Sequence, residues 1–405
     1  MKIAVVQLGA RMHYAVPRIF SEAGILSTLY TDICGTSGLG RLMSHLPHKL
    51  MPGGVRRLVA RQVSGVPADQ VVTFDRLGMA YWWSLRCART PREIAQAHLQ
   101  AGQELQEAVI RHGIDGTDAV YSFNSAGLEV MKFARAHHMR TFHEQTIAPV
   151  VVQTSLLKAE YARWRGWEIE PPYEEFYRPF EENEKAEWEL ADTILCGSEF
   201  VREGIAQAGG PVERAVVVPY GVNMTVDPAI LDQRSLREPG PLRVLTVGTV
   251  GLRKGSPYVM EVARKLQGRA DFRMAGPIDL TPDGASKLAE YVTLLGIVPR
   301  SEMAAQFSWA DVFLLPSICE GSATATYEAL AWGLPVVTTP NTGSPVVHDQ
   351  NGYVVPIRDV ERLVDALERL RDQDLRRKMG TLAISDSKKL NVSAYGHRLV
   401  EAIKS

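Results

Sequence analysis

Short apolar runs alternate along this chain with longer segments in which apolar residues recur every three or four positions. The runs at 3–8, 119–123, 243–247 and 312–315 are typical of strands buried on both faces of a parallel sheet. Helix-like segments follow these runs, and glycine or proline ends several of them. The alternation predicts an α/β fold with doubly wound parallel sheets, whose ligands bind beyond the carboxyl ends of the strands.

One break in this alternation divides the chain. Residues 227–242 contain proline, glycine and charge without an apolar period, which predicts an interdomain linker. We expect an N-terminal Rossmann-like domain over residues 1–235 and a second Rossmann-like domain over 242–385. Residues 386–405 are expected to form a helix that packs back on the first domain. A length of 405 residues is sufficient for two sizeable cores.

Two helical segments carry further predictions. The glutamate-rich run 181–189 predicts an exposed helix whose charges face water and form no site. Residues 359–379 show the apolar period of a single amphipathic helix. Asp372-Gln-Asp374, the one Asp-x-Asp triplet in the chain, falls within this segment. We therefore interpret the triplet as part of the surface rather than as a metal-binding motif.

Composition excludes some classes of protein. The 45 Lys and Arg nearly balance 46 Asp and Glu, so a formal net charge of -1 gives no reason to expect nucleic acid as a partner. The apolar run at 3–6 is too short for a signal peptide or a membrane helix. Four scattered cysteines form no Cys-x-x-Cys pair and no disulfide framework, and Cys319 is expected to pack rather than to react. These features predict a cytoplasmic protein.

A basic stretch near the N-terminus modifies that prediction. Residues 33–68 contain no acidic residue, and apolar positions are interleaved with five cations, namely Arg41, Lys49, Arg56, Arg57 and Arg61. Basic amphipathic segments bind anionic membrane surfaces, which would place the protein peripherally on the inner face of the membrane. A solvated helix pair packed on the domain is the alternative interpretation.

The most informative stretch is 312–339. A buried strand is followed by a polar turn that begins at Glu320, by an alanine-rich helix and by a second β-branched strand. Backbone N–H groups from Gly321 to Thr324 lie at the helix start, where the helix dipole favours a phosphate. Glu320 and Glu328 can border one cleft and accept hydrogen bonds from hydroxyl groups. A ligand with phosphate and several hydroxyls, such as a nucleotide sugar, fits this pattern.

Two other turns offer candidate chemistry. The glycine-rich turn 248–255 is not a Walker A loop, because its Lys254 precedes the last glycine, yet its flexible backbone and two cations can grip a diphosphate. A basic surface turn is the alternative. A strand that ends near 145 places His143 and Glu144 at its carboxyl end, where an open sheet carries functional groups, although such a histidine can also be structural.

The ordered set of motifs resembles the C-terminal half of GT-B glycosyltransferases, and it is most similar to glycosyltransferase family four, also called group one. The segments that carry this resemblance are 247–255, 296–299, 310–317, the pair Glu320 and Glu328, 333–336 and 351–352. Segments 197–201 and 218–222 are similar to the late N-terminal domain of that family. The resemblance spans about residues 190–360, and the first 180 residues match only in outline.

The resemblance implies a role for each matching residue. Glu328 would bind the ribose hydroxyls of a nucleotide-sugar donor, and Glu320 would contact the hydroxyls of the donor sugar. Arg253 and Lys254 would neutralise the leaving diphosphate. His143 would lie near the transferred sugar, so the implied catalytic set is His143, Arg253, Lys254 and Glu320. The other implied donor contacts are Gly9, Gly251, Ile297, Gly321, Ser322, Ala323 and Thr324.

The implied activity is retaining, metal-independent transfer of a hexosyl-type sugar from a UDP- or GDP-sugar. The acceptor would be a hydroxyl of a glycan, a lipid-linked glycan or a small molecule, and neither a metal nor another cofactor would be needed. The chain departs from the family pattern at Ala10, where a second glycine is usual, and at Glu144, where aspartate is commoner. Two alternatives stay open: a sugar-nucleotide epimerase or phosphorylase on the same fold, and a non-catalytic sugar-nucleotide-binding protein.

Overall fold

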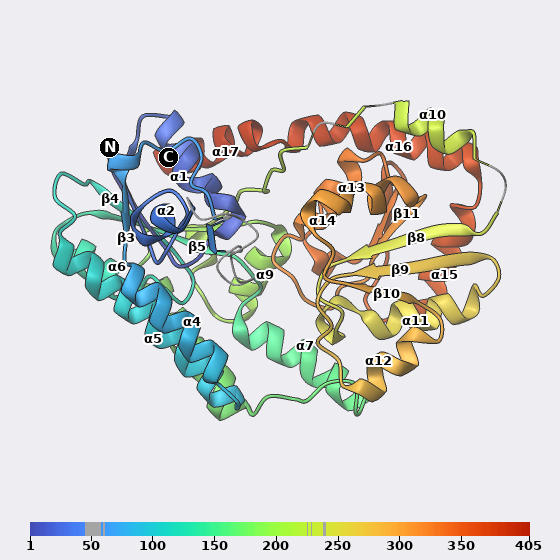
Figure 1. The fold of residues 1–405 in the computed structure, drawn as a ribbon, viewed down its shortest axis with the longest axis horizontal. Helices are drawn as coiled ribbons and strands as arrows, with labels where there is room; N and C mark the ends of the chain where they lie inside the picture. The colour runs from blue at the N-terminus through green and yellow to red at the C-terminus, as the bar shows by residue number, and fades with distance from the viewer. Residues whose placement is uncertain (45–57, 60, 225, 228, 238–239) are drawn as a thin grey trace.

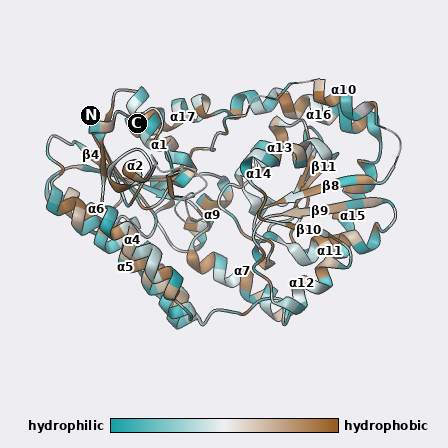
Figure 2. Cartoon of the chain, viewed as in Figure 1, coloured by the Kyte–Doolittle hydropathy of each residue, from teal (hydrophilic) through white to brown (hydrophobic). Residues whose placement is uncertain are grey.

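The chain folds into two α/β domains that lie side by side (Figure 1). The computed structural model describes residues 1–44, 58–59, 61–224, 226–227, 229–237 and 240–405. Each domain is built on one parallel sheet with helices on its faces. Apolar residues concentrate in the strands, and the covering helices alternate between apolar and polar positions (Figure 2). The predicted pair of doubly wound parallel sheets is confirmed.

The first sheet has seven strands in the order β3-β2-β1-β4-β5-β6-β7. Their bounds are β1 Ile3–Gln7, β2 Leu26–Thr31, β3 Val71–Thr73, β4 Ala119–Phe123, β5 Arg140–Gln145, β6 Thr193–Cys196 and β7 Ala215–Val217. The covering helices are α1 Ala15–Glu22, α2 Gly38–Ser44, α4 Asp75–Cys87, α5 Pro91–His112, α6 Leu128–Ala136, α8 Arg178–Leu190 and α9 Glu199–Gln207. The strand order reverses between β1 and β4, which makes their carboxyl ends a topological switch point.

The second sheet has six strands in the order β10-β9-β8-β11-β12-β13. Their bounds are β8 Leu242–Val247, β9 Ala270–Ala275, β10 Thr293–Gly296, β11 Val312–Leu315, β12 Val336–Thr338 and β13 Gly352–Val354. The helices are α11 Ser256–Lys265, α12 Pro282–Ala289, α13 Arg300–Trp309, α14 Thr324–Ala331, α15 Val360–Arg369 and α16 Gln373–Ser387. β11 is buried along its whole length, as its continuous apolar run predicts, and it pairs with β8 at the second switch point.

Three helices connect the domains: α7 Val150–Arg163, α10 Ala229–Ser235 and α17 Val392–Lys404. Beyond its middle, α7 leaves the first domain, and Trp167 just after it is buried in the core of the second domain. Glu160 of α7 is fully buried and accepts hydrogen bonds from the Tyr258 hydroxyl at 2.7 Å and from Nε of Arg358 at 2.5 Å. The long α16 and α17 run along the opposite side in Figure 1. Tyr395 and Leu399 of α17 complete the apolar core of the first domain.

One sequence prediction was wrong in detail. Residues 359–379 form two helices rather than one, because the Asp372 carboxylate accepts hydrogen bonds from the N–H groups of Asp374 and Leu375 and so caps a new helix, α16. The segment predicted as the interdomain linker, 227–242, contains the helix α10. Arg234 of this helix donates to the carbonyl oxygen of Trp332 at 2.7 Å, which fastens α10 to the second domain.

Candidate active site

Apart from His143 and Ile297, the predicted site residues follow strands that form the two switch points. Loops at the carboxyl ends of the two sheets meet at this place: Oγ of Ser198 donates to the carbonyl oxygen of Gly321 at 2.5 Å, and the N–H of Ala148 donates to that of Glu320 at 3.3 Å. A Cβ atom on Gly321 would lie 1.9 Å from the carbonyl oxygen of Thr146. Only glycine therefore allows the loop after β11 to approach the first domain this closely.

Three of the predicted catalytic residues form one cluster. Arg253 and Lys254 lie in a 3₁₀ turn after β8, and Glu320 lies after β11. One Glu320 oxygen is 2.5 Å from Nη1 of Arg253 and 2.8 Å from Nζ of Lys254. Burial lowers the pKa of Lys254, and the neighbouring Glu320 carboxylate opposes that effect. A buried ammonium needs such a partner, so an anionic ligand that displaces Glu320 must supply equivalent charge.

The start of α14 offers free hydrogen-bond donors beside this cluster. The N–H groups of Gly321, Ser322 and Thr324 donate to no residue in the described part of the chain, whereas the N–H of Ala323 donates to the carbonyl oxygen of Thr342 at 3.2 Å. The Ser322 hydroxyl is already engaged by the Tyr327 hydroxyl at 2.7 Å. Backbone amides at a helix start bind anions, so this edge can hold phosphate oxygens through the main chain.

Glu328 lies on α14 and is half-buried. Its carboxylate forms no hydrogen bond or ion pair with any residue that the structure describes. Burial raises its pKa, and the charge of Arg300 acts in the opposite direction. An accessible carboxylate without a partner is suited to accept hydrogen bonds from ligand hydroxyls.

Arg300 and His13 join the two domains near Glu328, and the sequence analysis did not identify either of them. Nη1 of Arg300, at the start of α13, donates to Nε2 of His13, in the turn after β1, over 2.6 Å. The pKa of His13 is lowered mainly by burial and also by the charges of Arg300 and Arg18. The imidazole is therefore neutral, and its Nε2 can accept the hydrogen bond from Arg300. Isolated basic residues at the ends of elements and in turns carry no periodic signal, which is why both were missed.

Three other predicted donor contacts lie in the loops around the cluster. Gly9 has a φ of +74° and donates its N–H to Oδ1 of Asp32 at 2.9 Å, which fixes the loop after β1. Gly251 donates its N–H to Oγ of Ser256 at 2.8 Å. Ile297, after β10, is 72% exposed. The exposed side chain of Ile297 leaves an apolar surface that a flat ring could cover.

Glu168 is a second residue that the sequence analysis missed. It follows the crossing helix α7, and its Oε1 accepts a hydrogen bond of 2.5 Å from the N–H of Leu252 at the start of the Arg253–Lys254 turn. Burial raises the pKa of Glu168 to about 7, partly opposed by that hydrogen bond and reinforced by Asp279. Glu168 thus anchors part of the loop that holds the two cations, although it precedes that loop by more than eighty positions.

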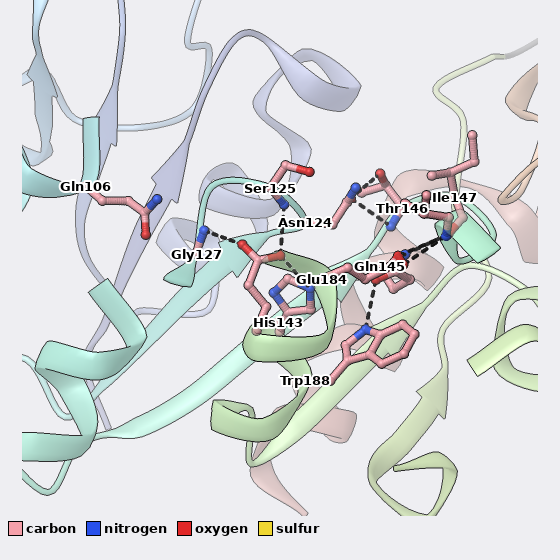
Figure 3. A network of polar contacts seen from close by, with 12 residues as sticks. Gln106, Asn124, Ser125, Gly127, His143, Gln145, Thr146, Ile147, Glu184 and Trp188 are labelled. Atoms are coloured by element: carbon pink, nitrogen blue, oxygen red, sulfur yellow. Dashed lines mark hydrogen bonds and ion pairs between the residues drawn. The ribbon is translucent and has the colours of Figure 1, made fainter. Parts of the chain in front are cut away.

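His143 lies inside the first domain, near Ser125 and Trp188 (Figure 3). It is fully buried on β5, neither ring nitrogen has a hydrogen-bond partner among the described residues, and Nε2 is 3.8 Å from Oε2 of Glu187. Burial lowers the pKa of His143 to about 3, so the ring is neutral at physiological pH. The structure therefore does not place His143 beside Arg253 and Lys254, and its catalytic role stays a prediction.

The acidic helix beside His143 corrects a prediction. Within α8, Glu184 and Glu187 are buried rather than solvated. Glu187 accepts hydrogen bonds from the N–H groups of Ser125 at 2.9 Å and Gly127 at 2.8 Å, and Glu184 accepts one from the N–H of Val150 at 2.9 Å. Glu184 also accepts a hydrogen bond from Nε2 of Gln145 at 2.8 Å (Figure 3). Burial raises the pKa of both carboxyls to about 7. The two side chains thus hold the loops after β4 and β5, on the side of the site that belongs to the first domain.

Glu144 and Arg11 complete this side of the site. Glu144 points away from His143, is buried, and accepts hydrogen bonds from the hydroxyls of Tyr121 at 2.5 Å and Tyr220 at 2.8 Å. Arg11, in the turn after β1, donates from Nη1 to Oγ1 of Thr146 at 3.0 Å. The Glu144 carboxylate is therefore engaged by two tyrosine hydroxyls within the core. Arg11, in contrast, places a cation beside the loop after β5.

The basic stretch 33–68 is only partly described. Lys49, Arg56 and Arg57 lie outside the described residues. Arg41 is exposed on α2, and Nη1 of Arg61 forms an ion pair with Oδ2 of Asp32 at 3.2 Å. Across the described ranges, none of the helices combines the length and the apolar character that a membrane crossing requires.

The two Rossmann-like domains, with their switch points facing one another, define the GT-B fold. Residues 241–373, within the second domain, match the family described as glycosyl transferases group 1. The predicted resemblance to this family and the predicted fold are confirmed.

Curated relatives match the chain in part. A protein of Salmonella typhimurium named as a colanic acid biosynthesis glycosyltransferase, WcaL, is 32% identical over 193 residues, which cover 44% of this chain and 47% of WcaL. The amylovoran biosynthesis glycosyltransferase AmsK of Erwinia amylovora is 34% identical over 32% of this chain and 36% of AmsK. A GDP-mannose-dependent mannosyltransferase of Mycobacterium tuberculosis, which acts on phosphatidylinositol monomannoside, is 30% identical over 47% of this chain and 55% of its own. The chain spans about half the length of the curated relatives it matches.

Solved structures match over the whole chain at low identity. The sucrose-phosphate synthase of Thermosynechococcus elongatus has a TM-score of 0.69 at 17% identity, with 100% of this chain and 98% of that chain covered. Anabaena HepE in complex with UDP-glucose has a TM-score of 0.61 at 14% identity, covering 100% and 99% of the two chains. At this level of identity, the comparison establishes the shared fold alone.

Proposed function

We propose that this chain is a glycosyltransferase that moves a hexosyl-type sugar from a UDP- or GDP-sugar to a hydroxyl of a glycan, lipid-linked glycan or small-molecule acceptor. The observation that carries the proposal is the meeting of Arg253 and Lys254 with the free N–H groups at the start of α14. The names of the relatives support it, since three of them are glycosyltransferases, and HepE was solved with UDP-glucose.

The cationic cluster would stabilise the leaving group. As the bond between the anomeric carbon and the diphosphate oxygen breaks, negative charge develops on that oxygen, and fixed cations and amides lower the barrier. Arg253 and Lys254 share one carboxylate, Glu320, so the trio carries one excess positive charge for the diphosphate. Glu320 would then be free to accept hydrogen bonds from the donor sugar. The acceptor oxygen would bond to the anomeric carbon on the face that the diphosphate leaves, and the acceptor proton would pass to the departing diphosphate oxygen, so that the configuration is retained without a metal.

Glu328 would bind the ribose of the donor, which gives the sharpest test. We expect one nucleoside diphosphate among UDP, GDP and ADP to raise the thermal midpoint in the presence of a chelator, and its sugar to serve as donor. Glu328→Ala should weaken binding of that nucleotide by about tenfold or more, because hydrogen bonds to a charged group contribute about 1.5–3 kcal/mol. Glu302→Ala, which removes an exposed carboxylate from α13, is the matched control.

Donor affinity and turnover that are both unchanged in Glu328→Ala would refute the proposed donor site. The alternative enzymes on this fold give other results in the same assay. An epimerase would interconvert its sugar nucleotide without an acceptor, and a phosphorylase would respond to inorganic phosphate. A non-catalytic binding protein would bind the nucleotide and transfer nothing.

A further inference from the structure

The outer face of α4 exposes large apolar side chains. Met79, Trp82 and Trp83 are 43%, 48% and 60% exposed. They lie at i, i+3 and i+4, so they project from the same side of the helix. The other five of the chain's 7 tryptophans are buried or half-buried. This concentration on one helical turn distinguishes α4 from the other described surface helices.

The opposite face of α4 is fixed on the first domain, so the exposed face is not left over from loose packing. A Cβ atom on Gly78 would lie 2.6 Å from Cγ2 of Ile33, which shows how closely the helix approaches the domain. The Tyr81 hydroxyl lies 2.7 Å from Nδ1 of His98 on α5, which runs beside α4 (Figure 1). The helix is therefore anchored from behind and presents its aromatic face outward.

Arginine surrounds this aromatic face. The stretch 76–92 contains four arginines and no acidic residue. Arg76 and Arg86 are exposed on α4 itself, and neither forms an ion pair with any residue that the structure describes. The guanidinium of Arg86 lies 5.4 Å from the centre of the Trp82 ring, so positive charge stands directly beside the apolar surface. Cations that are not neutralised within the protein are available to an external anion.

We propose that the α4 face formed by Arg76, Met79, Trp82, Trp83 and Arg86 docks on an anionic lipid surface. Tryptophan is favoured at the boundary between head groups and acyl chains, because its ring is apolar and its N–H is polar. Arginines around it attract the negative surface of the bilayer. Both the aromatic surface and the positive charge of this face therefore suit an anionic bilayer. A protein partner would have to supply carboxylates to pair with these arginines. Docking on lipid requires neither a sugar donor nor turnover, so it can be tested independently of the glycosyl transfer proposed above.

The test is vesicle flotation with the whole chain and no substrate. Wild type should float with phosphatidylcholine vesicles that contain phosphatidylglycerol and remain unbound with phosphatidylcholine alone, and added salt should weaken the binding. Arg86→Glu should reduce the partition coefficient at least about fivefold, which corresponds to one cation near an anionic surface. The Trp82→Ser/Trp83→Ser variant should lose both the binding and the blue shift of tryptophan emission that vesicles cause in wild type.

Matched controls remove comparable groups elsewhere. Leu236→Ser removes an apolar side chain that is 85% exposed, and Lys378→Glu reverses an exposed cation that has no ion pair in the described part of the chain. Both should bind vesicles as wild type does. Wild type that fails to float, or α4 variants that bind anionic vesicles like wild type, would overturn the proposal. So would a wild-type dimer that the Trp82→Ser/Trp83→Ser variant abolishes while vesicle binding persists, because the occupant would then be a second copy of the chain.

Discussion

Replacement of Glu187 by glutamine should change the way stability depends on pH. In the folded protein, burial raises the pKa of this carboxyl from its ordinary value of 4.5 to about 7. The free energy of protonating Glu187 is therefore more favourable in the folded state than in the unfolded state by about 3 kcal/mol. This stabilisation is complete below the unfolded pKa near 4.5, and it is lost as the pH rises through about 7. Glutamine does not titrate, so the variant lacks this dependence.

The assay is urea unfolding of wild type and Glu187→Gln at about pH 5 and about pH 8, followed by tryptophan emission. Relative to the variant, wild type should lose about 2–3 kcal/mol between the two pH values. The comparison cancels those titrating groups that do not interact with Glu187. Trp188 donates to Oε1 of Gln145 in the same network, so its emission reports on this region. Glu189→Gln, on the exposed side of α8, is the control.

A difference between wild type and Glu187→Gln that is the same at both pH values would refute this reasoning. It would mean that Glu187 ionises as easily in the folded protein as in water. In that case the N–H groups of Ser125 and Gly127 would compensate fully for the burial of the charge.

Three further predictions concern the rest of the molecule. Gly321→Ala should push apart the loops at the domain interface, because its Cβ atom would lie 1.9 Å from the Thr146 carbonyl oxygen. Turnover in the transfer assay should then fall strongly, and full activity would show that the loops adjust freely. Glu160→Ala should lower the free energy of unfolding by about 3–5 kcal/mol in urea, since it leaves Arg358 without its partner, and a loss below about 1 kcal/mol would contradict this. Of the chain's 4 cysteines, Cys87 alone is exposed, so a thiol reagent should label one site in the native protein and four after denaturation.

Much of the second domain could be predicted from the sequence because its signals are local. The apolar run 312–315 and the helix after it specify β11 and α14, and the turn between them places Glu320. Arg253 and Lys254 were found because a glycine-rich turn follows a buried strand. The topology then brings β8 and β11 together, so these side chains meet even though 66 or more positions separate them along the chain.

The signals that were missed depend on long-range contacts. The glutamates of α8 have the composition of a solvated helix, and nothing local shows that Glu187 caps the loop that starts at Ser125. Likewise, Glu168 reaches the Arg253–Lys254 turn only because α7 crosses to the other domain. Arg300 and His13 come from opposite halves of the chain and become neighbours only when both sheets are assembled. Residue periodicity carries no information about such pairings.

The exchange of segments between the domains sets the order in which the chain can fold during synthesis. Trp167 belongs to the first half of the sequence, but its ring is buried only when the later strands of the second domain pack against it. The core of the first domain, in turn, is closed by Tyr395, Leu399 and Ile403 of α17. Its apolar surface therefore stays partly open until α17 has been synthesised, so the second domain can complete its core before the first domain does. Truncation at residue 385 would accordingly damage the domain that is furthest away in sequence.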